Sequence, residues 1–113
     1  MATKQSTVDF LTEQITEAGD IRSRKMFGEY AIYCNEKVVA FVCDDKLFIK
    51  PTEPGKEFLE DKLEEAPAYP GSKNYFLISE DYWDDKDWLT ELISITENSL
   101  PFPKPKKSKT SKI

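Results

Sequence analysis

The chain has 113 residues, of which 39% are hydrophobic and 12% aromatic. This is enough for one folded domain with a modest core, and it argues against wholesale disorder. No apolar run approaches the roughly 18 residues of a membrane span, and the polar start has no signal-peptide core. We therefore expect a cytoplasmic protein without a membrane partner. The chain has no His, so acid–base chemistry would fall to carboxylates, Lys, Tyr or Cys.

Charge is unevenly distributed along the chain. The part before Pro103 holds all 21 acidic residues and 11 of the 16 basic ones, a net charge of −10. The five remaining lysines give the tail a charge of +5. An acidic body repels phosphate backbones, which disfavours nucleic acid as its partner. Residues 1–100 are predicted to form the domain and the Pro- and Lys-rich residues 101–113 a disordered tail.

The first predicted element is a helix over Thr7–Ala18. Ser6 and Asp9 have the spacing of a capping box, and Gly19 fits the position just after a helix end. The apolar residues recur at helical spacing and comprise Val8, Leu11, Ile15 and Ala18.

A three-strand antiparallel meander is predicted next, with strands at Met26–Cys34, Lys37–Cys43 and Lys46–Lys50. Its two-residue connections, Asn35-Glu36 and Asp44-Asp45, suit tight hairpins. Pairing Cys34 with Lys37 assigns the side chains to two faces. One face carries Ala31, Tyr33, Val38, Ala40, Val42, Leu47 and Ile49, and the other carries Tyr30, Ile32, Cys34, Val39, Phe41 and Phe48.

Both predicted faces are apolar, whereas a half-solvated sheet alternates apolar with polar residues. We therefore expect helices on one face and a second subunit on the other, which makes the protein a homodimer. The same pairing separates Cys34 from Cys43 by six positions along the strands, about 20 Å. Two free thiols are therefore expected.

The rest of the chain completes an α+β fold. A short helix is predicted over Gly55–Leu63 behind Pro54, followed by an irregular loop at Glu64–Lys73. A fourth strand is predicted at Asn74–Ser79 and a final helix at Asp85–Asn98. The apolar face of this helix comprises Trp88, Leu89, Leu92, Ile93 and Thr96.

Arg22, Arg24 and Lys25 form a small basic cluster next to Tyr30 and Tyr33. Cations interleaved with aromatic residues bind nucleic acid by stacking bases and holding phosphates. The planar fork of Arg24 also suits a partner's carboxylate. Alternatively, the charges protect an edge strand from unwanted pairing.

The densest group of carboxylates lies in the run 80–87, Glu-Asp-Tyr-Trp-Asp-Asp-Lys-Asp. Oxygen ligands of this kind suit a divalent cation, and a metal-dependent enzyme is one hypothesis for this run. It lacks the spacing of an EF-hand loop, however, and carboxylates at a helix start are also explained by the helix dipole. No metal, cofactor or catalytic residue is predicted.

Several short motifs occur together in a particular order. Basic residues precede Met26-Phe27-Gly28, and Tyr33 ends the first predicted strand. Two tight turns follow, and then Leu47-Phe48-Ile49-Lys50. The motifs Ala66-Pro67-Ala68-Tyr69 and Tyr75-Phe76 come later. From about Ile21 to Leu92, this order resembles the amino-terminal domain of the TfoX (Sxy) family of competence regulators.

The resemblance implies a fold similar to secretion-chaperone-like domains, pairing through the sheet, and no catalytic residues. Our leading hypothesis is a non-enzymatic regulatory or protein-interaction module. The alternative is a nucleic-acid-associated co-regulator that acts through the basic cluster and the Lys tail. The candidate partner-binding residues are Arg22, Arg24, Lys25, Phe27, Tyr30, Phe41 and Phe48.

Overall fold

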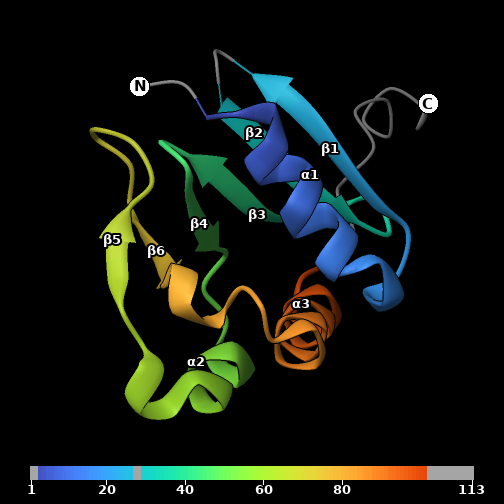
Figure 1. Ribbon diagram of the computed structural model, residues 1–113. Helices are drawn as coiled ribbons and strands as arrows, with labels where there is room; N and C mark the ends of the chain where they lie inside the picture. Colours follow the sequence, from blue (N-terminus) through green and yellow to red (C-terminus); the bar gives the residue numbers. More distant parts are fainter. Residues whose placement is uncertain (1–2, 27–28, 102–113) are drawn as a thin grey trace, which may run out of the picture.

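The computed structural model describes residues 3–26 and 29–101, which fold into three α-helices and one antiparallel sheet (Figure 1). The six strands lie in the order β1-β2-β3-β4-β6-β5. The described residues also form three single-turn 3-10 segments, η1 (Thr16–Ala18), η2 (Glu60–Lys62) and η3 (Glu80–Tyr82). The helices and strands are α1 (Gln5–Gln14), β1 (Ile21–Met26), β2 (Glu29–Cys34), β3 (Lys37–Cys43), β4 (Lys46–Ile49), α2 (Glu53–Leu59), β5 (Glu65–Pro67), β6 (Asn74–Ile78) and α3 (Lys86–Ser99). The predicted α+β class is confirmed.

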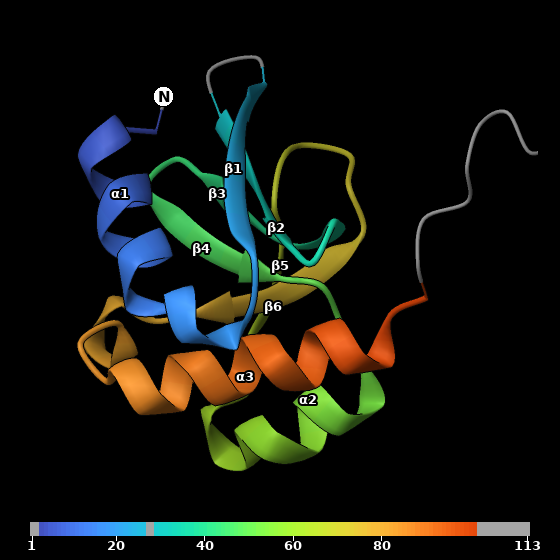
Figure 2. The ribbon, with the colours of Figure 1, turned by 90° about the vertical axis from the view of Figure 1, so that its right-hand side faces the viewer.

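The main core lies between the sheet and the helices. Figures 1 and 2 show α1 and α3 on one side of the sheet, with α2 next to α3. Fully buried side chains from α1, the sheet and α3 meet there; they include Val8, Leu11, Ile32, Val39, Val42, Ile49, Leu89, Leu92 and Ile93. We call this side of the sheet the helical face and the opposite side the outer face.

The first helix begins earlier than predicted. It covers Gln5–Gln14, and a separate 3-10 turn, η1, covers Thr16–Ala18. The predicted capping box is wrong, because Ser6 lies inside the helix. The N-cap residue of the helix is Lys4, and its side chain does not cap the helix. Instead, Oδ1 of Asp45 accepts the backbone N–H of Lys4 at 2.9 Å and the hydroxyl of Thr7 at 3.0 Å.

The meander contains one more strand than predicted. Residues Ile21–Met26 form β1, which pairs with β2, and residues 27 and 28 lie outside the described residues. The predicted first strand, Met26–Cys34, is therefore wrong in its bounds, since β2 begins at Glu29. Four consecutive residues of β1, Arg22 to Lys25, are exposed. Because neither face of β1 is apolar, alternation did not reveal the strand.

A β-bulge in the second hairpin shifts the predicted register by one residue. Tyr33 pairs with Val38 as predicted, but Ile32 pairs with Ala40, which leaves Val39 as the extra residue. Side chains beyond the bulge therefore change face. The predicted faces are corrected accordingly: Ala40, Val42, Leu47 and Ile49 join Tyr30, Ile32 and Cys34 on the helical face, whereas Phe41 and Phe48 lie on the outer face.

The second half of the fold contains the predicted elements, but the short helix predicted over Gly55–Leu63 covers Glu53–Leu59 and is followed by η2. Thr52 caps α2 with Pro54 in its first turn, β6 forms over Asn74–Ile78, and Asp85 caps α3 through the N–H of Trp88. The predicted loop contains one short strand, β5, which pairs with β6. Cys34 and Cys43 are both buried and free, as predicted. Among the described helices, none combines the length and apolar content needed to cross a bilayer.

Candidate interaction surface

The outer face carries a row of paired side chains that runs across five strands. Arg24 pairs with Ala31 and Ala31 with Phe41, while Phe41 pairs with Phe48 and Phe48 with Leu77. Residues directly opposite one another in an antiparallel sheet share a face. The row is therefore apolar across β2, β3, β4 and β6, and it ends in a cation on β1.

Only part of this row is covered. Ala68, in the β5–β6 connection, packs against the cluster that contains Phe48 and Tyr75, and Phe48 is only 4% exposed. The rings of Phe41 and Tyr75 meet edge to face, with their centroids 5.5 Å apart. Phe41 and Leu77 remain half-buried. Figure 2 shows the β5–β6 connection, in yellow, on the side of the sheet away from α1 and α3.

The basic cluster is divided between the two faces. Arg22 and Arg24 are exposed and lie on the outer face, because they pair with Tyr33 and Ala31. Lys25 is exposed as well but pairs with Tyr30, so it belongs to the helical face. Of the two aromatic residues predicted to lie next to the basic cluster, Tyr33 therefore shares the outer face with Arg22 and Arg24.

The aromatic candidates for partner binding also lie on different faces of the sheet. Tyr30 was expected to share a face with Phe41 and Phe48, and this is wrong because of the bulge. Its side chain is 5% exposed, packs in the main core and donates its hydroxyl proton to Oε1 of Gln5 at 2.8 Å. Phe41 is accessible and Phe48 is not. Phe27 lies outside the described residues.

A cleft of about 660 Å³ opens at the end of the outer face near β1. One of its lining residues, Tyr69, is 53% exposed. Its lining is Met26, Glu29, Tyr30, Phe41, Cys43 and Tyr69. Burial, followed by the nearby carboxylates of Glu29 and Asp44, raises the pKa of the Cys43 thiol to about 11. The thiol is therefore protonated at neutral pH and is a poor nucleophile.

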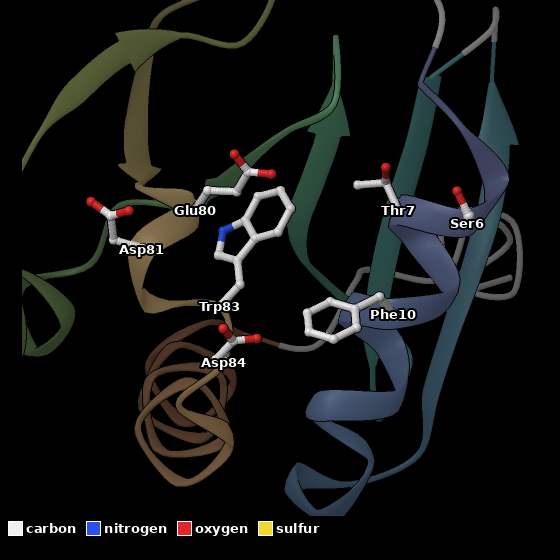
Figure 3. A pocket seen from close by; sticks show the side chains of 7 residues that line it. All are labelled: Ser6, Thr7, Phe10, Glu80, Asp81, Trp83 and Asp84. Atoms are coloured by element: carbon white, nitrogen blue, oxygen red, sulfur yellow. The ribbon is translucent and has the colours of Figure 1, made fainter.

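A second depression, of about 560 Å³, lies between α1 and the segment that carries the acidic run. Figure 3 shows the rings of Phe10 and Trp83 on its two sides, with Asp84 below them. Trp83 is fixed by its indole N–H, which donates to the carbonyl of Ile78 at 3.2 Å. Asp85 serves as the cap of α3. Within residues 3–26 and 29–101, no group of three or more Cys, Asp and Glu side chains is arranged to hold a metal ion.

Met26 and Tyr69 were not predicted as contributors to the outer face, and Tyr33 was predicted only as a neighbour of the basic cluster. Tyr33 and Met26 flank the paired row because β1 lies beside β2, and β1 had not been predicted. Tyr69 reaches the cleft from a loop. The alternative interpretation of the basic residues before Met26, that their charges protect an edge strand, was the available signal for β1.

Comparison with known proteins identifies the family of this chain. The model of the TfoX N-terminal domain matches residues 13–98, which include every element from β1 to β6 and nearly all of α3. An uncharacterised 12.7 kDa protein in the trpE 5′ region of Spirochaeta aurantia is 41% identical over 110 residues, which cover 97% of this chain and 94% of that protein. The chain belongs to the TfoX N-terminal domain family.

Proposed function

We propose that this chain is a non-enzymatic regulatory module that acts by binding proteins, and that it forms a homodimer through the outer face of its sheet. The observation that carries the proposal is the apolar row of Ala31, Phe41, Phe48 and Leu77, in which Ala31 and Phe48 are buried and Phe41 and Leu77 remain partly exposed. Apolar side chains that stay accessible to solvent on a folded domain can mark an association surface. Membership of the TfoX N-terminal domain family supports a regulatory role, and competence regulation is the setting that we propose.

The chemistry of the two thiols supports a binding role over a catalytic one. Burial raises the pKa of Cys34, and the carboxylates of Glu97 and Asp20 raise it further. Burial also raises the pKa of Cys43 to about 11. Nucleophilic cysteines require the opposite shift.

Light scattering on the full chain tests the dimer. At tens of micromolar we expect about twice the monomer mass of 13.0 kDa. Phe41→Glu places a charge at the accessible centre of the row and is expected to return the mass to that of a monomer. Phe10→Glu is the control for adding a charge at an accessible aromatic residue, because Phe10 is 40% exposed and lies on α1, away from the outer face. A monomer mass for the unmodified chain at every concentration would contradict the proposal.

A second function is favoured by one observation, the placement of Arg22 beside Tyr33 on the outer face. Cations next to an accessible ring suit single-stranded nucleic acid. The acidic body, with a net charge of −10 before Pro103, opposes it. A labelled oligonucleotide titrated at low salt tests this alternative, which requires binding that weakens steeply as salt is added.

A further inference from the structure

Strand β1 is an open edge of the sheet. It is the first strand in the sheet order and pairs only with β2 among the described strands. Figure 1 shows it, in light blue, at the border of the sheet beside α1. Its central residues, Arg22 to Lys25, are all exposed. An edge strand presents unpaired N–H and C=O groups that can pair with another extended chain.

The backbone groups that point outward can be identified. The N–H of Asn35 donates to the carbonyl of Asp20 at 2.9 Å, and the β1–β2 register is unbroken from Ile21 to Met26. In an antiparallel pair, every second residue forms backbone hydrogen bonds with the neighbouring strand. Since Asp20 is bonded in this way, Arg22 and Arg24 are expected to form backbone hydrogen bonds with β2 as well. The free N–H and C=O groups of the edge then belong to Ile21, Ser23 and Lys25.

The charge of this edge is opposite to that of the body. β1 contains three cations and no carboxylate. Arg22 lies 3.2 Å from Asp20, but both side chains are more than half exposed, so the pair is weak. Arg24 and Lys25 have no ion-pair partner among the described residues. The outer face of the edge therefore offers two Arg side chains two positions apart.

A second copy of the chain does not fit this edge well. Antiparallel pairing of β1 with itself about Ser23 would place Arg22 opposite Arg24, and like charges directly opposite one another destabilise a sheet. The other edge, β5, has only three residues and ends in Pro67, which cannot donate to a ladder. Charge complementarity selects an acidic partner instead.

We propose that β1 binds an extended acidic segment of another protein, which adds a seventh strand to the sheet. Two carboxylates separated by one residue in that segment lie beside Arg22 and Arg24, each in reach of a planar guanidinium fork. The backbone of the segment forms hydrogen bonds with the free N–H and C=O groups of Ile21, Ser23 and Lys25. This inference rests on the proposed protein-binding function, but it uses the open backbone edge of β1, which borders the proposed dimer surface at Arg24.

A synthetic peptide tests the proposal against the full chain. The probe is a capped, labelled eight-residue peptide with two Glu residues separated by one Val, and its control has Gln in place of both Glu residues. We expect the Glu peptide to bind and the Gln peptide to bind at least roughly tenfold more weakly. Arg24→Gln should weaken the Glu peptide by a similar factor, whereas the tail variant K107Q/K109Q should not. Equal binding of the two peptides overturns the proposal.

Ser23→Pro separates strand addition from simple charge attraction. Proline removes the outward N–H at residue 23 and leaves the β1–β2 ladder intact, and its fixed φ is tolerated in an edge strand. We expect this variant to lose peptide binding while its unfolding midpoint stays close to that of the unmodified chain. Bound peptide should also slow hydrogen exchange at the amides of Ser23 and Lys25. Unchanged affinity in the folded Ser23→Pro variant overturns strand addition.

Three further outcomes are informative. Phe41→Glu should bind the peptide normally, so loss of the dimer and loss of peptide binding are separate results. Displacement of the peptide by a single-stranded oligonucleotide would overturn the preference for an acidic protein segment. Exchange protection at Ser23 that rises with protein concentration, without peptide, would show that a second copy occupies the edge and would overturn the proposal as well.

Discussion

The two-residue turns that join β2 to β3 and β3 to β4 place non-glycine residues at positive φ. Asn35 and Glu36 have φ values of 52° and 71°, and Asp44 and Asp45 have values of 54° and 58°. Asn and Asp tolerate this region better than Glu. We therefore expect Glu36→Gly to raise the free energy of unfolding by about 0.5 to 1 kcal/mol. Urea unfolding of the two chains measures the difference, and a lower midpoint for the variant would contradict it.

Unlike Glu36, Asp45 has a side chain that stabilises the fold, because its carboxylate accepts hydrogen bonds from Lys4 and Thr7. The backbone N–H of Lys4, followed by the Thr7 hydroxyl and the charge of Lys4, lowers the pKa of Asp45. A lowered folded-state pKa stabilises the fold above the unfolded pKa, near 3.9, and this contribution is lost as the pH falls through the folded value. Asp45→Asn should therefore be less stable than the unmodified chain at pH 7, and the difference should shrink at pH 3. A gap that is equal at both pH values would show that charge is not the cause.

Asp45 also explains why the start of the first helix was predicted wrongly. Ser6 and Asp9 have correct local spacing for a capping box, and local spacing is all that a sequence pattern reports. The acceptor that Lys4 uses comes from a turn 41 positions away. The helix consequently begins at Gln5, a boundary that depends on the tertiary fold.

At the scale of elements, strongly apolar segments were predicted well and polar ones poorly. β3, β4, β6 and α3 have clear patterns and lie where expected. β1 is polar on both faces, and β5 is three residues that end in Pro67. The bulge at Val39 carries no sequence signal, since Val38, Val39 and Ala40 are all apolar. That single residue reversed the predicted faces of Phe41 and Phe48.

One buried ion pair joins the second hairpin to α3. Nζ of Lys37 lies 3.0 Å from Oε2 of Glu97 and donates to its backbone carbonyl at 2.8 Å, and the two side chains are 9% and 14% exposed. Removing one partner leaves an uncompensated charge in the interior. We expect Lys37→Met to lower the free energy of unfolding by about 3 kcal/mol.

Lys46→Met is the matched control for Lys37→Met. Lys46 also begins a strand directly after a two-residue turn, but it is exposed, so its replacement should change stability by less than about 0.5 kcal/mol. Chemical unfolding of both variants makes the comparison. Equal effects would mean that the pair between Lys37 and Glu97 contributes little. The sequence does not distinguish these two lysines, because the burial of Lys37 depends on where α3 ends.

For the whole molecule, the distribution of charge and apolar surface favours two kinds of protein contact, one with a second copy of the chain and one with an acidic segment of another protein. The acidic body opposes phosphate, the apolar row suits a second copy, and the basic edge suits an acidic chain. The charge of the body follows from composition, and the apolar character of both sheet faces was predicted, although the residues of the row depend on the bulge. The preference of the basic edge for an acidic chain required the structure, because it depends on β1 lying at the end of the sheet.

A dimer through the outer face makes stability depend on protein concentration. Association that occurs only in the folded state stabilises it by mass action. We expect the Tm of the full chain to rise by several degrees over a hundredfold increase in concentration. The Tm of Phe41→Glu should stay constant over the same range, because that variant is expected to remain monomeric. A constant Tm for the unmodified chain, with Phe10→Glu behaving identically, would mean that the half-buried ring of Phe41 faces solvent in the functional protein.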